Sequence, residues 1–88
     1  MFTTKKTIIA NKDITPRFVK NFVAEVTHIK SNLYFVVGDR EINAKSILGI
    51  ISVNIKNGDK FEVCVNNSIS QECTENDINK VIELLMGD

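Results

Sequence analysis

Residues 11–26 read NKDITPRFVKNFVAEV and mark the passage from a strand into a helix. Thr15 can cap a helix with its hydroxyl, and Pro16 suits the first helical position, where its missing N–H costs nothing. Apolar residues then recur at helical spacing, namely Phe18, Val19, Phe22, Val23 and Val26. The stretch therefore predicts a helix that extends to about Thr27 and has one apolar face.

Four other segments are expected to be strands. Thr3 to Ala10 is rich in β-branched residues, and Lys60 to Asn66 alternates between apolar and polar residues. The segments 32–37 and 40–43 flank Gly38-Asp39, a dipeptide that suits a two-residue hairpin turn.

Two further helices are predicted towards the C-terminus. Ser46 is a good N-cap for a short helix that runs to Val53, although β-branched residues lower its helix propensity. Thr74 and Asp77 resemble a capping box, so the last helix is expected to start at Thr74 and to end at Gly87. The order β-α-β-β-α-β-α suggests one α+β domain over residues 1–88. We expect an open-faced β-sandwich, with a four-stranded antiparallel sheet and three helices on one face.

The composition argues against several classes of function. Eleven basic and eleven acidic residues give a formal net charge of zero, which removes the electrostatic case for nucleic-acid or membrane-surface binding. No signal peptide is recognised, and no apolar stretch approaches the roughly 20 residues of a membrane span, so we expect a cytoplasmic protein. Cys64 and Cys73 are expected to be reduced thiols, with Cys64 as a buried apolar side chain. No Cys/His spacing suggests a metal site, and no cofactor is expected.

The loop at residues 11–18 resembles the phosphohistidine loop of HPr, the small phosphocarrier of bacterial sugar phosphotransferase systems. That loop reads roughly G-[IL]-H-[AT]-R-P, and Ile14 and Arg17 match it. Thr15 stands where the family has its phosphorylated histidine, Asp13 where it has glycine, and Phe18 where it has proline. The hydroxyl of a threonine is almost wholly protonated at neutral pH, and nothing nearby looks like a general base for it. The resemblance therefore implies the carrier's scaffold without its catalytic group.

Two other residues bear on this loop. Arg17 is a candidate partner-binding residue that can contact a phosphate or an acidic side chain, although a solvated surface arginine is an equally good interpretation. His28 is the only histidine and lies about twelve residues along the same predicted helix, roughly 18 Å away at 1.5 Å per residue. It is therefore too far away to replace the missing imidazole.

Residues 43–52, NAKSILGIIS, resemble the family's regulatory segment, which in Gram-positive members reads close to K-S-I-M-G-V-M-S. In that family the serine matched by Ser46 is phosphorylated by an ATP-dependent HPr kinase/phosphorylase. The phosphoserine form then acts as corepressor of a LacI-type catabolite control protein. The resemblance implies that Ser46 is a regulatory phosphorylation site beside an apolar docking patch of Ile47, Leu48 and Ile51. On the pattern alone, an ordinary N-cap and ordinary core residues are the commoner case.

Three functions remain open at this point. The preferred one is a non-enzymatic regulatory module similar to Crh, the catabolite-repression type of HPr that also lacks the histidine. Its implied partners are the HPr kinase/phosphorylase and the LacI-type catabolite control protein. The second is a phosphotransferase-system carrier with an altered loop that accepts phosphate on Thr15 or elsewhere. The third is an HPr-fold interaction domain without phosphorylation, because a fold does not fix a function.

Overall fold

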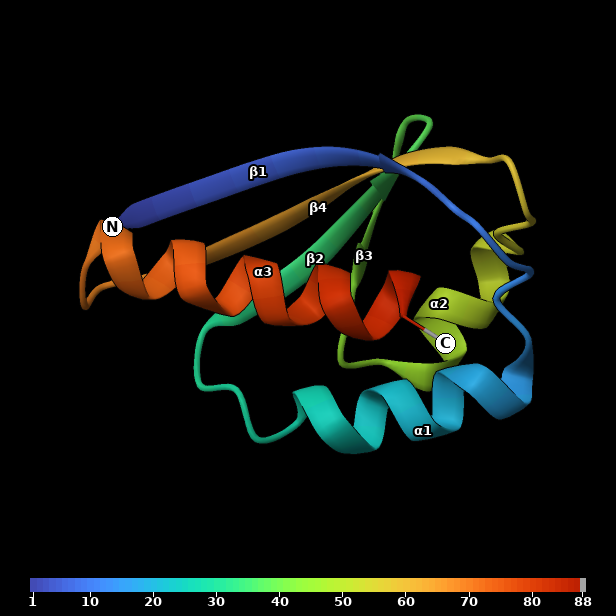
Figure 1. Ribbon diagram of the computed structural model, residues 1–88, viewed down its shortest axis with the longest axis horizontal. Helices are drawn as coiled ribbons and strands as arrows, with labels where there is room; N and C mark the ends of the chain where they lie inside the picture. The colour runs from blue at the N-terminus through green and yellow to red at the C-terminus, as the bar shows by residue number, and fades with distance from the viewer. Residues whose placement is uncertain (88) are drawn as a thin grey trace.

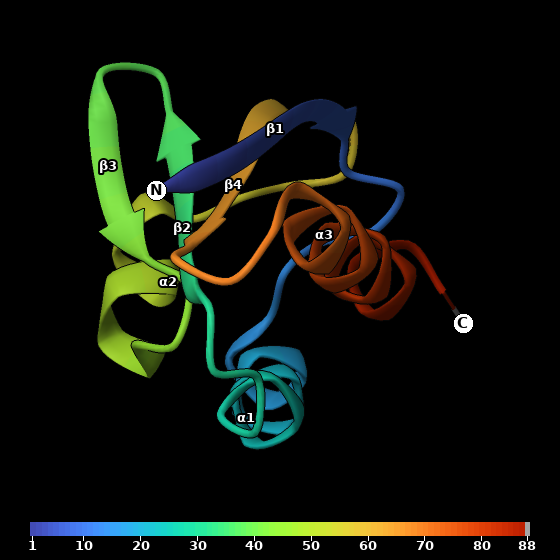
Figure 2. The same cartoon turned by 90° about the vertical axis from the view of Figure 1, so that its left-hand side faces the viewer.

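The computed structural model describes residues 1–87 and has the element order β-α-β-β-α-β-α. Its elements are β1 (Phe2–Ile9), α1 (Pro16–Val26), β2 (Asn32–Val37), β3 (Arg40–Asn43), α2 (Ile47–Val53), β4 (Lys60–Asn67) and α3 (Gln71–Met86). The strands form one four-stranded antiparallel sheet in the order β1-β4-β2-β3. The three helices cover one face of it (Figure 1), and the end-on view in Figure 2 shows the other face free of helices. The predicted fold class is confirmed.

The central strand β4 connects distant parts of the chain. It pairs with β1 along its whole length, from Phe2 opposite Asn67 to Ile9 opposite Lys60. On its other side it pairs with β2, and a tight turn then leads into the edge strand β3. Gly38 in that turn has a φ of 63°, a conformation that suits glycine.

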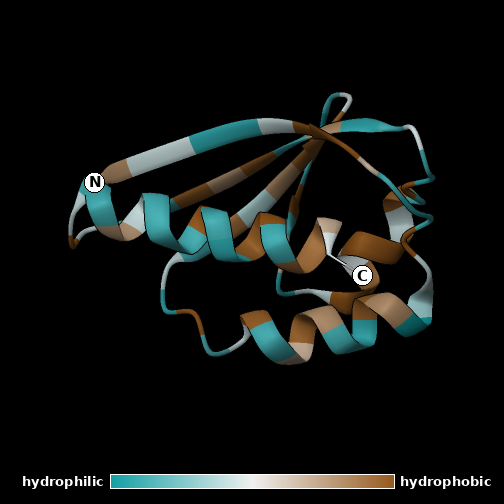
Figure 3. Cartoon of the chain, in the orientation of Figure 1, coloured by the Kyte–Doolittle hydropathy of each residue, from teal (hydrophilic) through white to brown (hydrophobic). Residues whose placement is uncertain are grey.

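The core lies between the sheet and the helices. Because side chains alternate along a strand, β4 directs Phe61, Val63 and Val65 to the helix face, where all three are buried. Phe35 of β2 is fully buried, with its ring centroid 5.3 Å from that of Phe61 in an edge-on arrangement. Figure 3 shows the mixture of apolar and polar residues along α1 and α3 that is typical of helices with one buried face.

The prediction that the last helix starts at Thr74 is wrong. The helix α3 starts at Gln71, and its N-cap is Ser70, whose hydroxyl accepts a hydrogen bond from the Cys73 N–H at 3.0 Å. Thr74 lies in the first turn and is fully buried. Its hydroxyl donates to the Gln71 carbonyl at 2.7 Å and lies 2.8 Å from the hydroxyl of Thr4. This residue therefore joins α3 to β1 and does not cap the helix.

A polar network also holds the first turns of α3 against the loop before β2. Asp77, which was expected to complete a capping box, instead accepts a hydrogen bond from the hydroxyl of Ser31. The buried Asn67 donates its side-chain N–H to the Ser31 hydroxyl at 2.9 Å, and its side-chain oxygen accepts from the Ser70 N–H at 3.2 Å. The loop before β2, the end of β4 and the first turns of α3 are thereby joined.

Cys64 is buried, as expected, but on the helix-free face of the sheet. It lies between Lys5 of β1 and Tyr34 of β2, and its side chain points away from that of Val63 and from the main core. Burial, together with a hydrogen bond to Glu62 that acts in the same direction, raises the pKa of the thiol from 9.0 to about 12. Within residues 1–87, no helix has the length and apolar character needed to cross a membrane.

Candidate functional site

The loop between β1 and α1 is attached to the end of α3. Asn11 donates its side-chain N–H to the Met86 carbonyl at 2.8 Å, and the ammonium of Lys12 donates to the Gly87 carbonyl. The same ammonium lies 5.1 Å from the ring centroid of Phe18, at a cation–π distance. The side chains that start the loop therefore hold the last turn of α3.

The next two residues attach the loop to the segment before β4. One carboxylate oxygen of Asp13 accepts the Asn57 N–H at 2.9 Å, and the Ile14 N–H donates to the Ile55 carbonyl at 3.0 Å. Ile14 is itself buried in the core. Asp13 thus has a structural role at the position where the phosphohistidine loop has glycine.

Thr15 is the N-cap of α1, as predicted. Its backbone is extended, with φ −79° and ψ 159°, and its hydroxyl accepts the Phe18 N–H at 3.2 Å. Pro16 occupies the first helical position. Phe18 is half-buried and stacks on Phe22, with ring centroids 6.1 Å apart. An aromatic ring therefore occupies the position of the family's proline.

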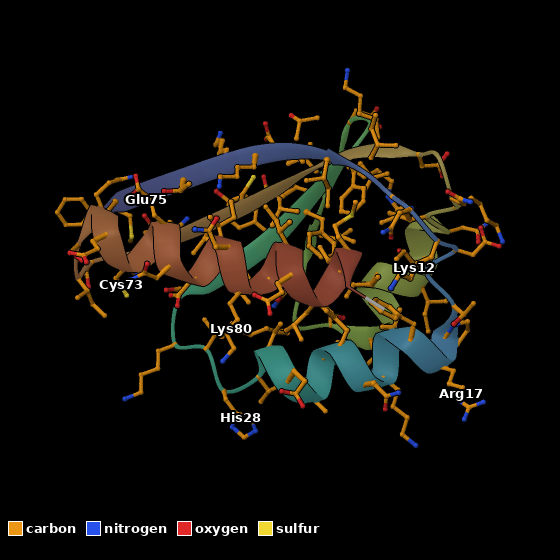
Figure 4. The ribbon with its side chains drawn as sticks, viewed as in Figure 1. Lys12, Arg17, His28, Cys73, Glu75 and Lys80 are labelled. Carbon is orange, nitrogen blue, oxygen red and sulfur yellow. The ribbon has the colours of Figure 1, made fainter. Side chains whose placement is uncertain are left out.

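Arg17 and His28 lie at opposite ends of α1 (Figure 4). The side chain of Arg17 is exposed and makes no hydrogen bond or ion pair with any other of residues 1–87. His28 lies just beyond Val26, the last residue of the helix, and is also exposed. The imidazole therefore does not meet Thr15, and the guanidinium of Arg17 is exposed to solvent.

Ser46 is the N-cap of α2, as predicted. Its side chain is half-buried, and its hydroxyl accepts the Gly49 N–H at 3.1 Å. The ammonium of the preceding residue, Lys45, donates to the Ile29 carbonyl beyond the end of α1. This lysine is therefore engaged in a structural contact and is turned towards α1.

The three apolar residues expected to form a docking patch differ in their exposure. Leu48 is 79% exposed and Ile47 is 39% exposed, whereas Ile51 is half-buried and packs against the core. The helices α1 and α2 pack against each other, and α2 lies at the same end of the molecule as the start of α1 (Figure 1). Two helices that pack against each other therefore carry these residues: Arg17 lies on α1, and Ser46 lies at the start of α2 beside the exposed Ile47 and Leu48.

The far end of α2 is also held in place. Arg40 of β3 donates to the Ser52 hydroxyl at 3.2 Å, and that hydroxyl donates to the Gly49 carbonyl at 2.7 Å. Asn54 ends the helix in the left-handed conformation, with a φ of 49°. These contacts fix the orientation in which α2 presents its first turn.

Within residues 1–87, no group of three or more His, Cys, Asp or Glu side chains is placed to hold a metal ion. A pocket of about 280 Å³ lies beside β2 and β3, bordered by Tyr34, Glu41 and Lys45 among others. None of the candidate residues of α1 and α2 lines this pocket.

The family model described as "PTS HPr component phosphorylation site" matches residues 2–84. This chain belongs to the HPr family. The fold agrees with solved HPr structures, among them the phosphocarrier protein HPr from Bacillus anthracis. That protein is 20% identical, with a TM-score of 0.83, and the match covers 96% of this chain and 98% of the other.

Two further HPr-family structures share the fold. HPr-C-His from Thermoanaerobacter tengcongensis is 19% identical, with a TM-score of 0.68 over 97% of this chain and 96% of the other. Crh from Bacillus subtilis, described as the catabolite repression containing protein, is 24% identical, with a TM-score of 0.63 over 94% and 95%. A search of curated proteins gives no match. At these identities the solved structures establish a common fold, and the roles of individual residues are argued from this chain alone.

Proposed function

We propose that this chain is a Crh-type, non-enzymatic regulatory member of the HPr family that has no phosphohistidine carrier activity. In this proposal Ser46 is phosphorylated by the cytoplasmic HPr kinase/phosphorylase, and the phosphoserine form acts in carbon catabolite regulation by binding a LacI-type catabolite control protein. The observation that carries the proposal is Thr15, which occupies the position of the family's phosphorylated histidine and uses its hydroxyl to cap α1.

The chemistry of the loop supports the loss of carrier activity. A carrier needs a nucleophile with a usable lone pair at neutral pH, whereas the threonine hydroxyl is almost wholly protonated there and already accepts the Phe18 N–H. The carboxylate of Asp13, two residues earlier, disfavours a second negative group close by. The carboxylate of Asp13 also accepts a hydrogen bond from the Asn57 N–H, which attaches the loop to the segment before β4.

The surroundings of Ser46 support a regulatory role. A phosphate at the N-terminal end of a helix lies beside backbone N–H groups and the positive end of the helix dipole, so the modification does not require the fold to open. No acidic residue lies in the first turn of α2 to repel it. Ile47 and Leu48 follow directly and offer exposed apolar surface, and Arg17 on the neighbouring helix offers a guanidinium that suits a carboxylate or phosphate.

Intact-mass spectrometry after two parallel incubations tests the proposal. One mixture contains ATP and HPr kinase/phosphorylase, and the other contains phosphoenolpyruvate and the general phosphotransferase enzyme. We expect one added phosphate in the first mixture, absent from the Ser46→Ala variant, and none in the second. Phosphate transferred from phosphoenolpyruvate would identify a carrier and refute the proposal. An unmodified chain in both mixtures would favour an interaction domain without phosphorylation.

A further inference from the structure

Gly49, the third residue of α2, stands where the backbone does not require glycine. Among the glycines only Gly38 and Gly58 have a positive φ, so the conformation of Gly49 is open to any residue. Glycine inside a helix lowers its stability relative to alanine because more backbone freedom is lost on folding. A conformational need therefore does not account for glycine at this position.

The surroundings of Gly49 suggest another reason. A Cβ built on this residue would lie 3.2 Å from the hydroxyl oxygen of Ser46 and 3.3 Å from its Cβ. The next nearest atom, the Asn43 carbonyl oxygen, would be 3.6 Å away, which is an ordinary van der Waals distance. The two tight contacts of any side chain at position 49 would thus both be made with Ser46.

We propose that Gly49 is a positioning residue for the phosphorylation of Ser46, because its missing side chain leaves the space that the phosphoryl group needs around the hydroxyl. The inference rests on the proposed function and adds a residue that sets whether the serine can react. In the transfer, a lone pair of the Ser46 oxygen forms the new O–P bond with the γ-phosphorus of ATP. The bond from that phosphorus to the bridging oxygen of ADP breaks, and the hydroxyl proton leaves to a base of the kinase.

The distances explain why one methyl group should matter. Reacting atoms in a productive complex approach to about 3–3.5 Å before the bond forms. A methyl group at position 49 would lie 3.2 Å from the Ser46 oxygen, within the same range of distances at which the γ-phosphorus has to approach that oxygen. The hydroxyl is already confined on this side, since it accepts the Gly49 N–H at 3.1 Å. With alanine at position 49, the hydroxyl can move away only by weakening that hydrogen bond.

Steady-state phosphorylation of Gly49→Ala by HPr kinase/phosphorylase tests the inference. We expect kcat/KM to fall by roughly tenfold, because the contacts at 3.2 and 3.3 Å call for a shift smaller than the misplacement of about 1 Å that can cost on the order of 10²-fold. The urea midpoint should change little, because the helix stability gained from alanine offsets the weakened hydrogen bond between the Gly49 N–H and the Ser46 hydroxyl. Gly38→Ala is the matched control, with open space around its Cβ but a φ of 63°. It should lower the urea midpoint and leave kcat/KM unchanged.

A second measurement does not depend on the kinase. Phosphoserine is installed at position 46 by genetic encoding, with glycine or alanine at position 49, and the urea midpoints of both proteins are compared with their unphosphorylated forms. We expect phosphorylation to stabilise the alanine background less than the glycine background, as read from the change in urea midpoint.

The outcomes separate the two proposals. Equal kcat/KM for the wild type and Gly49→Ala would overturn the role of Gly49 while the proposed function stands. Absence of phosphorylation in the wild type, in a mixture that modifies authentic HPr, would overturn the proposed function. In that case the phosphoserine comparison still decides the steric argument, and equal midpoint changes in the two backgrounds would refute it.

Discussion

Replacement of Thr15 by alanine separates a structural from a chemical role for the residue at the family's phosphohistidine position. The helix α1 begins with Pro16, which has no N–H, and the Val19 N–H already bonds to the Thr15 carbonyl at 2.9 Å. The free donors of the first turn are therefore the N–H groups of Arg17 and Phe18, and the Thr15 hydroxyl satisfies the second. Loss of such a cap typically costs about 1 kcal/mol, within a range of roughly 0.5–2 kcal/mol.

The size of this effect suits a urea titration followed by circular dichroism. For a small domain the dependence of the unfolding free energy on urea is about 1 kcal/mol per M, so a loss of about 1 kcal/mol should lower the midpoint by about 1 M. Thr15→Ser is the matched control, because serine is at least as good an N-cap. It should lie close to the wild type in stability.

The same variants decide whether Thr15 accepts phosphate. We expect neither the wild type nor Thr15→Ala to be labelled by phosphoenolpyruvate and the general phosphotransferase enzyme. If the wild type were labelled and Thr15→Ala were not, Thr15 would be a phosphate acceptor and the capping argument would not describe its function. If Thr15→Ala were as stable as the wild type, the hydrogen bond to Phe18 would contribute nothing, and the structural explanation of this residue would be refuted.

Three other predictions follow from the caps, the buried thiol and the exposed leucine. Ser46→Ala should lower the free energy of unfolding by about 1 kcal/mol, whereas Ser46→Asp should retain the cap and the favourable dipole interaction, as measured by urea unfolding. Burial and the hydrogen bond to Glu62 raise the pKa of Cys64 from 9.0 to about 12, so the folded chain keeps a proton that the unfolded chain loses. Stability should therefore be unaffected by this thiol below pH 9 and should fall as pH rises from about 9 towards 12, a decline that unfolding titrations of Cys64→Ala should lack. Leu48→Ala should change the unfolding free energy by less than about 0.5 kcal/mol, because the side chain is 79% exposed, yet should weaken binding of the Ser46-phosphorylated form to the catabolite control protein in calorimetry.

The arrangement of helices and strands is largely readable from local pattern. The alternation in β4 and the helical spacing in α1 each bury one face, and such patterns leave few ways to arrange four strands and three helices. The N-caps Thr15 and Ser46 were predictable because a hydroxyl residue directly precedes an apolar helical run. These are interactions over three or four residues, and they are visible in the sequence.

The features that the sequence predicted wrongly or did not predict depend on contacts between residues that are far apart in the sequence. Ser70 and Thr74 are both good caps, and the choice between them depends on the contact of Thr74 with Thr4, seventy residues away. The role of Asp13 depends in the same way on Asn57, forty-four residues away. No periodicity or spacing in one sequence encodes such pairings. The hydrogen bond that attaches the loop before α1 to the segment before β4 therefore became visible only in the structure.

The position of β1 at the edge of the sheet has a consequence for synthesis. This strand pairs with β4 alone, and Lys6 lies opposite Val63 in that register. At about 5–20 residues per second, roughly 3–13 s separate the emergence of β1 from that of its partner during translation. Lys5 and Lys6 in the middle of the strand discourage pairing with other chains during this interval, since charged residues on an edge strand oppose aggregation. The N-terminal strand should thus be among the last parts of the nascent chain to acquire its native neighbours, and protease protection of Lys5 and Lys6 on stalled ribosomes should appear only after β4 has left the exit tunnel.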